Sequence, residues 1–172
     1  IGWSGSYSTG PYLQLIEDVI QQTMSEFNLK LLVIGAQKKY IQGVTYELIP
    51  WNADTEVEDL QRIDIGLYPL PNEKWVYGKS GLKAIQFMAL GIPVVATAIG
   101  TNHRVIDHGI NGFLAKNKND WKNFIKILCE NHTKRIEMGK KAREKVKEQF
   151  SVNANKNKYL EVFNYSFRNI VN

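Results

Sequence analysis

Residues 69–112 read PLPNEKWVYGKSGLKAIQFMALGIPVVATAIGTNHRVIDHGING, and the rest of the chain can be understood from this stretch. Two prolines open a loop, and a Gly-Lys-Ser-Gly turn at residues 78–81 closes it. Apolar residues then recur at the spacing of a helix with one buried face, at Leu82, Ile85, Met88 and Ala89. The stretch therefore predicts a glycine turn that leads directly into a helix.

A helix that begins in a glycine turn is suited to bind an anion. Its first N–H groups have no partner within the helix, they carry a partial positive charge, and glycine lets an anion approach them closely. Lys79 lies in the turn and Lys83 follows one helical turn later, so both ammonium groups can face one phosphate. The alternative interpretation is a pair of surface lysines beside a tight turn.

A buried strand is predicted directly after this helix. Residues 91–97 form a short run of mostly apolar, β-branched residues, which begins at Gly91 and is followed by Gly100. Such a run is typical of a parallel strand whose two faces are both buried. Because ligands of open α/β sheets bind at the carboxyl ends of the strands, we expect residues 97–102 on the same rim as the glycine turn.

Strands and helices are predicted to alternate along the rest of the chain. The apolar runs indicate further strands at residues 1–3, 29–35, 44–50, 63–67 and 112–115. Parallel strands need crossover connections, and helices usually supply them. The pattern therefore predicts an α/β fold with a doubly wound parallel sheet of about six strands and helices on both faces.

Several helices have recognisable starts. One is expected from a cap at Ser8 or Thr9 to about residue 27, and a second from a capping box made by Thr55 and Glu58. A short helix or turn is expected near residues 105–110, and helices at 120–130, at 133–149 and after Ser151. The last one carries an apolar stripe that either packs on the domain or is left exposed: Tyr159, Leu160, Phe163, Phe167 and Ile170.

Size and composition fit one globular domain that spans residues 1–172. No apolar run approaches the ~20 residues that span a bilayer. The single Cys129 excludes an internal disulfide, and the three histidines lack metal-ligand spacing, so we expect no metal and no cofactor. The chain starts inside an expected strand, without an initiator Met or a leader, which predicts a fragment of a longer protein.

The net charge of +5 and the isoelectric point near 9.2 favour anionic partners: a nucleotide diphosphate, nucleic acid or an anionic membrane face. The lysines and arginines of residues 133–149 are interspersed with Glu137, Glu144 and Glu148. This mixture is typical of a solvated, salt-bridged helix, and it lacks the interleaved aromatic residues of a nucleic-acid surface. We expect no nucleic-acid partner.

The order of motifs resembles a known family. Gly-Lys-Ser-Gly, then Gln-Phe-Met-Ala-Leu-Gly-Ile-Pro-Val-Val-Ala, Gly-Thr-Asn and His-Gly-Ile-Asn-Gly-Phe-Leu-Ala follow one another over residues 78–115, after Ile-Gly-Trp-Ser-Gly-Ser at residues 1–6. This series is similar to the donor-binding half of GT-B glycosyltransferases of the group 1 family. The resemblance implies a Rossmann-like domain that is the C-terminal half of a GT-B enzyme, with the acceptor-binding N-terminal half absent.

The resemblance implies an activity as well. A hexose-type sugar would pass from a nucleotide-diphosphate donor, a UDP- or GDP-sugar, to an acceptor hydroxyl with retention of configuration. The acceptor, a glycan or lipid-linked saccharide in polysaccharide biosynthesis, would bind the absent half, so this chain alone is expected to be inactive. A cytoplasmic location is implied, with peripheral contact at the inner face of the membrane as an option.

The family carries a Glu-x7-Glu pair before the buried strand, and this sequence departs from it. Gly78 stands at the first position and Gln86, whose amide can still bond a ribose, at the second. Glu73 is a nearby candidate substitute. The family's diphosphate-binding Arg and Lys also lack counterparts after residue 4, so Lys79 and Lys83 are predicted to stabilise the leaving diphosphate as the catalytic residues.

The predicted donor-binding residues come from four parts of the chain. Gly5 and Ser6 form a turn that either offers amides to phosphate or only connects strand and helix, and Trp51 either lines the nucleobase pocket or covers the sheet as a hydrophobic plug. Thr101 and Asn102 are candidates for the sugar hydroxyls. The full predicted set is Gly5, Ser6, Trp51, Gly78, Ser80, Gly81, Gln86, Gly100, Thr101 and Asn102.

Two other functions compete with this interpretation. A non-catalytic nucleotide-binding or assembly module of the same fold would explain the altered glutamates. A dinucleotide-dependent oxidoreductase needs Gly-x-Gly-x-x-Gly directly after a strand, and residues 2–8 do not supply it. The sequence therefore favours a glycosyltransferase domain, while the donor nucleotide, the sugar and the acceptor stay open.

Overall fold

Six short parallel strands form one sheet at the centre of the computed structural model, which describes residues 1–170 and side chains as far as residue 164. The strands lie in the order β3-β2-β1-β4-β5-β6, and each neighbouring pair runs parallel. Their bounds are β1 Gly2–Ser4, β2 Leu32–Ile34, β3 Glu47–Ile49, β4 Gly66–Tyr68, β5 Val94–Thr97 and β6 Gly112–Ala115. The predicted doubly wound, Rossmann-like sheet of six strands is confirmed.

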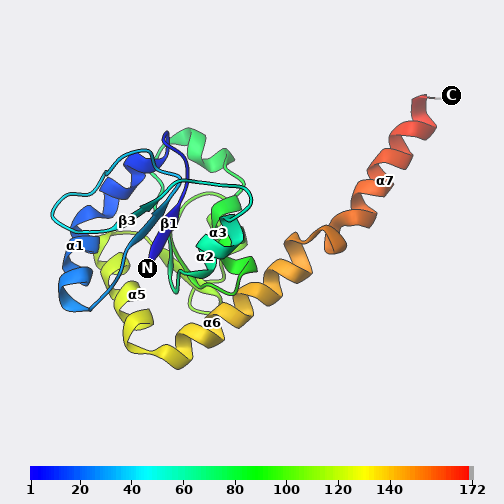
Figure 1. Cartoon of the computed structure of the whole chain (residues 1–172). Helices are drawn as coiled ribbons and strands as arrows, with labels where there is room; N and C mark the ends of the chain where they lie inside the picture. The colour runs from blue at the N-terminus through cyan, green and yellow to red at the C-terminus, as the bar shows by residue number, and fades with distance from the viewer. Residues whose placement is uncertain (171–172) are drawn as a thin grey trace.

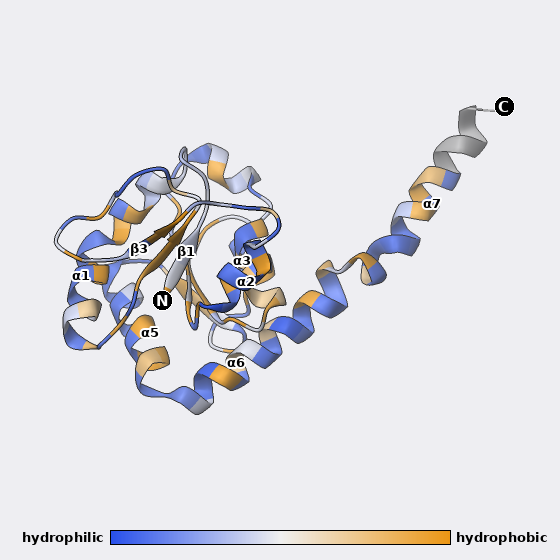
Figure 2. Ribbon diagram, in the orientation of Figure 1, coloured by the Kyte–Doolittle hydropathy of each residue, from blue (hydrophilic) through white to orange (hydrophobic). Residues whose placement is uncertain are grey.

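Helices cover both faces of the sheet (Figure 1). One face carries η1 (Gly10–Ile16), α1 (Glu17–Glu26) and α5 (Lys118–Glu130), and the other carries α2 (Glu56–Gln61), α3 (Leu82–Ala89) and α4 (Asn102–Val105). Successive side chains of a strand point to opposite faces, so Val95 belongs to the first core and Val94 to the second. The strands supply buried residues to both cores, as buried parallel strands do, and Figure 2 colours β3 as hydrophobic and β1 as nearly neutral.

Several strands are shorter than the sequence predicts. The apolar run before β3 is the clearest case, because Tyr46 leaves the sheet and its hydroxyl accepts a hydrogen bond from the backbone N–H of Tyr40 at 2.8 Å. Residues 44–46 therefore belong to the loop that follows β2 and are not part of a strand. An apolar run indicates that its residues are buried, but it does not show that they are paired in the sheet. Tyr46 is buried next to the sheet without belonging to β3.

Two predicted helix caps are wrong. The hydroxyl of Thr9 accepts from the backbone N–H of Ser6 at 3.0 Å, so it closes the preceding turn, and the segment after it is a 3-10 helix. The hydroxyl of Thr55 donates to the Asp59 carboxylate at 2.9 Å, a charge-assisted bond that replaces the expected capping box with Glu58. In both places the threonine hydroxyl bonds to a group that the cap pattern does not include, so it does not cap its helix.

The buried face of α3 also differs from the prediction. Ala84, Phe87 and Met88 are fully buried, whereas Leu82 is 56% exposed. Leu82 is the first residue of the helix, and it lies on the side that faces away from the sheet. The short η2 helix (Lys74–Gly78) occupies the loop before it.

The C-terminal part of the chain leaves the sheet. The α6 helix (His132–Lys145) contributes Met138 to one core and Ala142 to the other, and a π-helical turn η3 (Val146–Phe150) joins it to α7 (Val152–Ile170). The Ser151 hydroxyl caps α7 by accepting from the Ala154 N–H, as predicted.

The apolar stripe of α7 is exposed in the part that the structure describes. The helix extends away from the sheet (Figure 1), and Tyr159, Leu160 and Phe163 are all more than half exposed. Phe167 and Ile170 lie outside the residues whose side chains are described.

The loops that follow β1 and β2 touch at Gly35. This glycine has a left-handed backbone, with φ at +82°, and a Cβ atom placed on it would collide with the carbonyl oxygen of Gly5. Trp51 lies next to the same position, since its own Cβ would be 3.4 Å from the added atom. Glycine at this point lets three loops meet at the carboxyl edge of the sheet.

We expect Gly35→Ala to destabilise the fold more than Gly109→Ala. Both glycines are left-handed, at φ +82° and +80°, so alanine costs about 1–2 kcal/mol of backbone strain at either position. Only Gly35 meets a backbone oxygen, while Gly109 faces open space, so the collision adds about 1–3 kcal/mol at Gly35. Urea unfolding of both variants measures the difference, and equal losses would contradict this account.

Candidate functional site

A pocket of about 630 Å³ lies at the carboxyl edge of the sheet, where β1 and β4 lead to connections on opposite sides. This reversal of strand order is where open α/β sheets bind ligands. The lining residues come from the ends of β1 and β4, from the loops after β1 to β4, and from η1, α2 and α3: Trp3, Ser4, Gly5, Ser6, Tyr7, Thr9, Tyr12, Gly35, Gln37, Trp51, Glu56, Tyr68, Pro69, Leu70, Lys79, Lys83 and Gln86.

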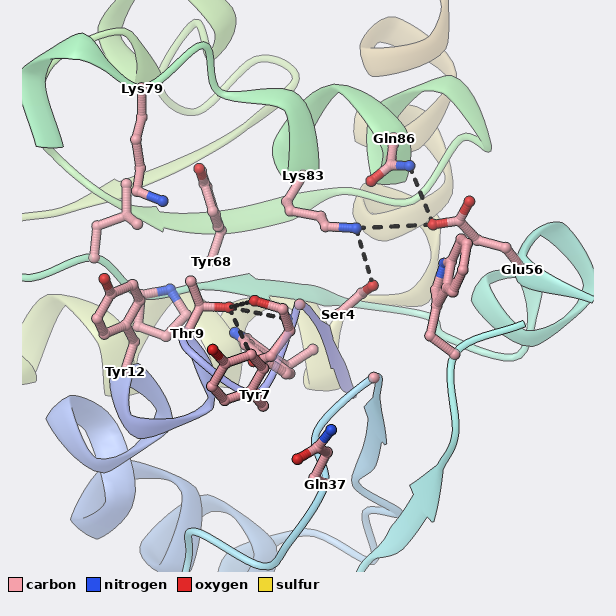
Figure 3. Close-up of a pocket in the computed structure, with 17 residues that line it drawn as sticks. Ser4, Tyr7, Thr9, Tyr12, Gln37, Glu56, Tyr68, Lys79, Lys83 and Gln86 are labelled. Carbon is pink, nitrogen blue, oxygen red and sulfur yellow. Dashed lines mark hydrogen bonds and ion pairs between the residues drawn. The ribbon is translucent and has the colours of Figure 1, made fainter. Parts of the chain in front are cut away.

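Two lysines from the glycine-turn region reach this pocket (Figure 3). The ammonium nitrogen of Lys79 lies 5.0 Å from the centre of the Trp75 ring and 5.9 Å from that of Tyr12. Such cation–π contacts orient an ammonium group without neutralising its charge. The predicted convergence of Lys79 and Lys83 on one cavity therefore fits the geometry.

Lys83 has polar partners. Its ammonium nitrogen lies 3.5 Å from the Ser4 hydroxyl oxygen and 3.8 Å from Oε1 of Glu56. The first distance is at the limit for a hydrogen bond and the second is beyond it, so the contact with Glu56 is an ion pair without a hydrogen bond. Figure 3 shows Lys83 between Lys79 and Glu56 along the pocket wall.

Glu56 and Gln86 form the other end of the pocket. The Gln86 amide nitrogen donates to Oε1 of Glu56 at 3.2 Å, and the Gln86 amide oxygen is buried without a hydrogen-bond partner among the described residues. Sequence reasoning missed Glu56, because the adjacent Thr55 and Glu58 suggested a cap. The available signal was its position at the start of α2, soon after Trp51 and the carboxyl end of β3.

Tyrosine hydroxyls line the pocket too, and sequence reasoning also missed them. Burial raises the pKa of Tyr68, and burial together with the Glu73 carboxylate raises the pKa of Tyr12. Both phenols therefore stay neutral near pH 7 and keep a proton to donate. Glu73, the candidate substitute for a missing glutamate, does not line the pocket and accepts a bond from the Trp75 indole.

The turn after β1 lines the pocket, and the backbone amides of Gly5 and Ser6 in it already have partners within the chain. The N–H of Gly5 donates to the Ile34 carbonyl at 3.0 Å, and the N–H of Ser6 donates to the Thr9 hydroxyl. Of the two interpretations of Gly5 and Ser6, this geometry fits the plain strand-to-helix connection better. Trp51 is 53% exposed, so it borders the pocket and does not act as a buried plug.

Six predicted donor-binding residues lie beside the pocket and not in its lining: Gly78, Ser80, Gly81, Gly100, Thr101 and Asn102. The start of α3 packs on α4, since a Cβ on Gly81 would lie 3.0 Å from a methyl group of Val105. No side chain caps α3 at Gly81. The amide of the buried Asn102 donates to the Thr97 carbonyl at 2.9 Å, so this side chain braces the end of β5.

The described part of the chain shows neither a metal cluster nor a membrane-spanning helix. Among residues 1–170, no group of three His, Cys, Asp or Glu side chains is placed to hold a metal ion. None of the helices in this range combines the length and apolarity that crossing a bilayer requires.

Comparison with known proteins identifies the family. The model of the family described as "Glycosyl transferases group 1" matches residues 3–131. The chain belongs to the group 1 glycosyltransferases. A D-inositol 3-phosphate glycosyltransferase from Pseudarthrobacter chlorophenolicus is 32% identical over 119 residues, which is 68% of this chain and 26% of that protein. The chain thus spans about a quarter of the length of this relative.

Solved structures support the same fold for this group 1 glycosyltransferase chain. A point mutant of S. aureus TarM, in complex with Fondaparinux, alpha-GlcNAc-glycerol and UDP, superposes with a TM-score of 0.77 at 24% identity over 95% of this chain and 35% of TarM. The C-terminal domain of a group 1 glycosyltransferase (LpcC) from Francisella tularensis gives 0.64 at 17% identity, covering 88% of this chain and 85% of that domain. These likenesses confirm the GT-B type of fold.

We expect Asn102→Ala to lower the free energy of unfolding by about 1–3 kcal/mol, because the Thr97 carbonyl loses a hydrogen bond and the buried side chain leaves a cavity. Asn72→Ala serves as the control, since Asn72 is exposed in the loop before η2. Thermal or urea unfolding measures both. An Asn102→Ala variant as stable as the wild type would argue against the bracing role.

Proposed function

We propose that this chain is the donor-binding, C-terminal half of a group 1 glycosyltransferase, and that its pocket binds a nucleotide-diphosphate sugar. The observation that carries the proposal is the convergence of Lys79 and Lys83 on one pocket at the carboxyl edge of the sheet. The likeness to the LpcC C-terminal domain and the UDP bound to TarM support it.

The diphosphate would be the leaving group of the reaction. As the bond to the sugar breaks, negative charge grows on the phosphate oxygens, and Lys79 and Lys83 stand where they can stabilise it. Losing one such preorganised donor typically costs about 3 kcal/mol in the transition state. Holding the donor in a fixed orientation is the second contribution of this half.

The finer features of the reaction belong to the same proposal. We infer a hexose-type sugar, a UDP- or GDP-linked donor, and transfer with retention to a hydroxyl of a glycan or lipid-linked saccharide on the cytoplasmic side. A second domain would bind that acceptor. The chain alone would therefore bind the donor without turning it over.

A non-catalytic nucleotide-binding module is the second candidate. It is favoured by Gly78 and Gln86, which stand where the resembled motif carries glutamates. Both candidates bind nucleotide, so sugar transfer by the whole protein distinguishes them.

We expect the 172-residue chain to bind one of UDP and GDP, as measured by calorimetric titration. Lys79→Ala should weaken binding roughly 10- to 100-fold, because a charge-assisted contact of about 1.5–3 kcal/mol is lost. Lys74→Ala removes the same charge from an exposed site four residues after the pocket-lining Leu70, and it should leave the affinity unchanged. Binding that Lys79→Ala does not alter would show that the phosphate lies elsewhere.

A further inference from the structure

Two aromatic rings hold the ammonium group of Lys79. Its nitrogen lies 5.0 Å from the centre of the Trp75 ring and 5.9 Å from that of Tyr12, and the two ring centres are 6.3 Å apart. The planes of the rings are inclined by 40° to each other, so one cation can contact the π-electrons of both. Trp75 and Tyr12 are called the aromatic clamp below.

The aromatic clamp joins the two walls of the pocket. Tyr12 belongs to η1, which follows β1, and Trp75 belongs to η2, which follows β4. Their neighbours Leu13 and Val76 are buried in the two different cores, so the two segments are anchored on opposite faces of the sheet. Figure 3 shows Lys79 and Tyr12 on facing sides of the pocket. The clamp therefore spans the crevice where the strand order reverses.

Glu73 orients the Trp75 ring, since the indole N–H donates to its carboxylate. The same carboxylate lies near Tyr12, because burial and, after it, the Glu73 charge raise the pKa of that phenol. Within the described part of the chain Lys79 takes part in no salt bridge. Glu73 thus fixes the ring that contacts Lys79 and leaves the ammonium charge unpaired.

An exposed tryptophan in a loop has a simpler explanation, which is contact with another part of the protein. Trp75 is 51% exposed, and Tyr77 in the same short helix is 58% exposed. Among the described residues, however, only Trp75 of these two has an aromatic neighbour, a cation and a hydrogen-bond acceptor. The Trp75 side chain is organised around Lys79, and Tyr77 is a matched residue without these contacts.

An ammonium group that is already held in place binds an anion more tightly than a flexible one. A lysine side chain is long and flexible, and it loses rotamer freedom when an anion fixes it. A carboxylate could also hold the ammonium group, but it would compete with the anion for the charge, whereas aromatic rings do not neutralise it. The aromatic clamp lets Lys79 lose this freedom before the ligand arrives.

We propose that Trp75, oriented by Glu73, is a positioning residue that holds Lys79 ready for the diphosphate of the ligand, with Tyr12 as the second ring of the clamp. The inference rests on the proposed function of the same pocket. It gives a role in ligand binding to two side chains that do not line the pocket, those of Glu73 and Trp75.

The test measures the affinity of the whole chain for UDP and GDP by calorimetric titration. Trp75→Leu should weaken binding about 3- to 10-fold, through the loss of one exposed cation–π contact and the freedom that Lys79 regains. Trp75→Phe keeps an aromatic face, so its affinity should stay within about 2-fold of the wild type. Tyr77→Leu, the matched control in the same short helix, should leave the affinity unchanged.

A double-mutant cycle separates positioning from a general loss of structure. In a Lys79→Ala background, Trp75→Leu should weaken binding no further, because no ammonium group is left to position. Equal weakening in both backgrounds, or wild-type affinity in Trp75→Leu, would overturn the proposal while the proposed function stands. No binding of UDP or GDP by the wild type would overturn the proposed function itself, and this inference with it.

The orienting role of Glu73 is tested by the sign of an effect. If its charge alone matters, Glu73→Ala removes a carboxylate near the pocket and should tighten the binding of an anion. If Glu73 orients Trp75, the same change should weaken binding, and it should not do so in a Trp75→Leu background. Tighter binding by Glu73→Ala would show that Glu73 does not orient the clamp.

Discussion

The shared direction of the six strands is the constraint on which the site depends. Since all strands run parallel, all of them end at one edge, and every connection to the next element begins there. Ser6 after β1, Gln37 after β2, Trp51 after β3 and Pro69 after β4 are brought together by this alone. Gly35 then lets the first two of these loops meet without a side chain between them.

The two pocket lysines have different surroundings, and this difference shapes the chemistry of the pocket. Lys79 is held over aromatic rings, which leave its charge uncompensated, whereas Lys83 shares its charge with Glu56. A bound anion would gain most from Lys79, because no carboxylate in the described part of the pocket wall is paired with it.

Periodicity and glycine position were enough to predict the sheet and the α3 helix, and they led to Lys79 and Lys83, which both line the pocket. They failed where a contact joins distant segments. Nothing local in the sequence shows that Thr55 bonds Asp59 in preference to forming a cap, or that Tyr46 folds back onto Tyr40. The pairing of Glu56 with Gln86 is of this kind too, because it crosses between two helices. Sequence patterns describe single elements, and a binding site is made between them.

The altered motif at Gly78 and Gln86 has a different setting in the folded chain than in the sequence. Gln86 stands where the resembled family has a carboxylate, and alone this substitution indicates weakened chemistry. In the folded chain the Glu56 carboxylate lies beside Gln86, because it reaches that amide from the neighbouring helix. The pocket wall therefore contains two ammonium groups and a carboxylate that come from different parts of the sequence. Function depends on which groups meet in space, so a substitution within a sequence motif does not by itself decide what the site can do.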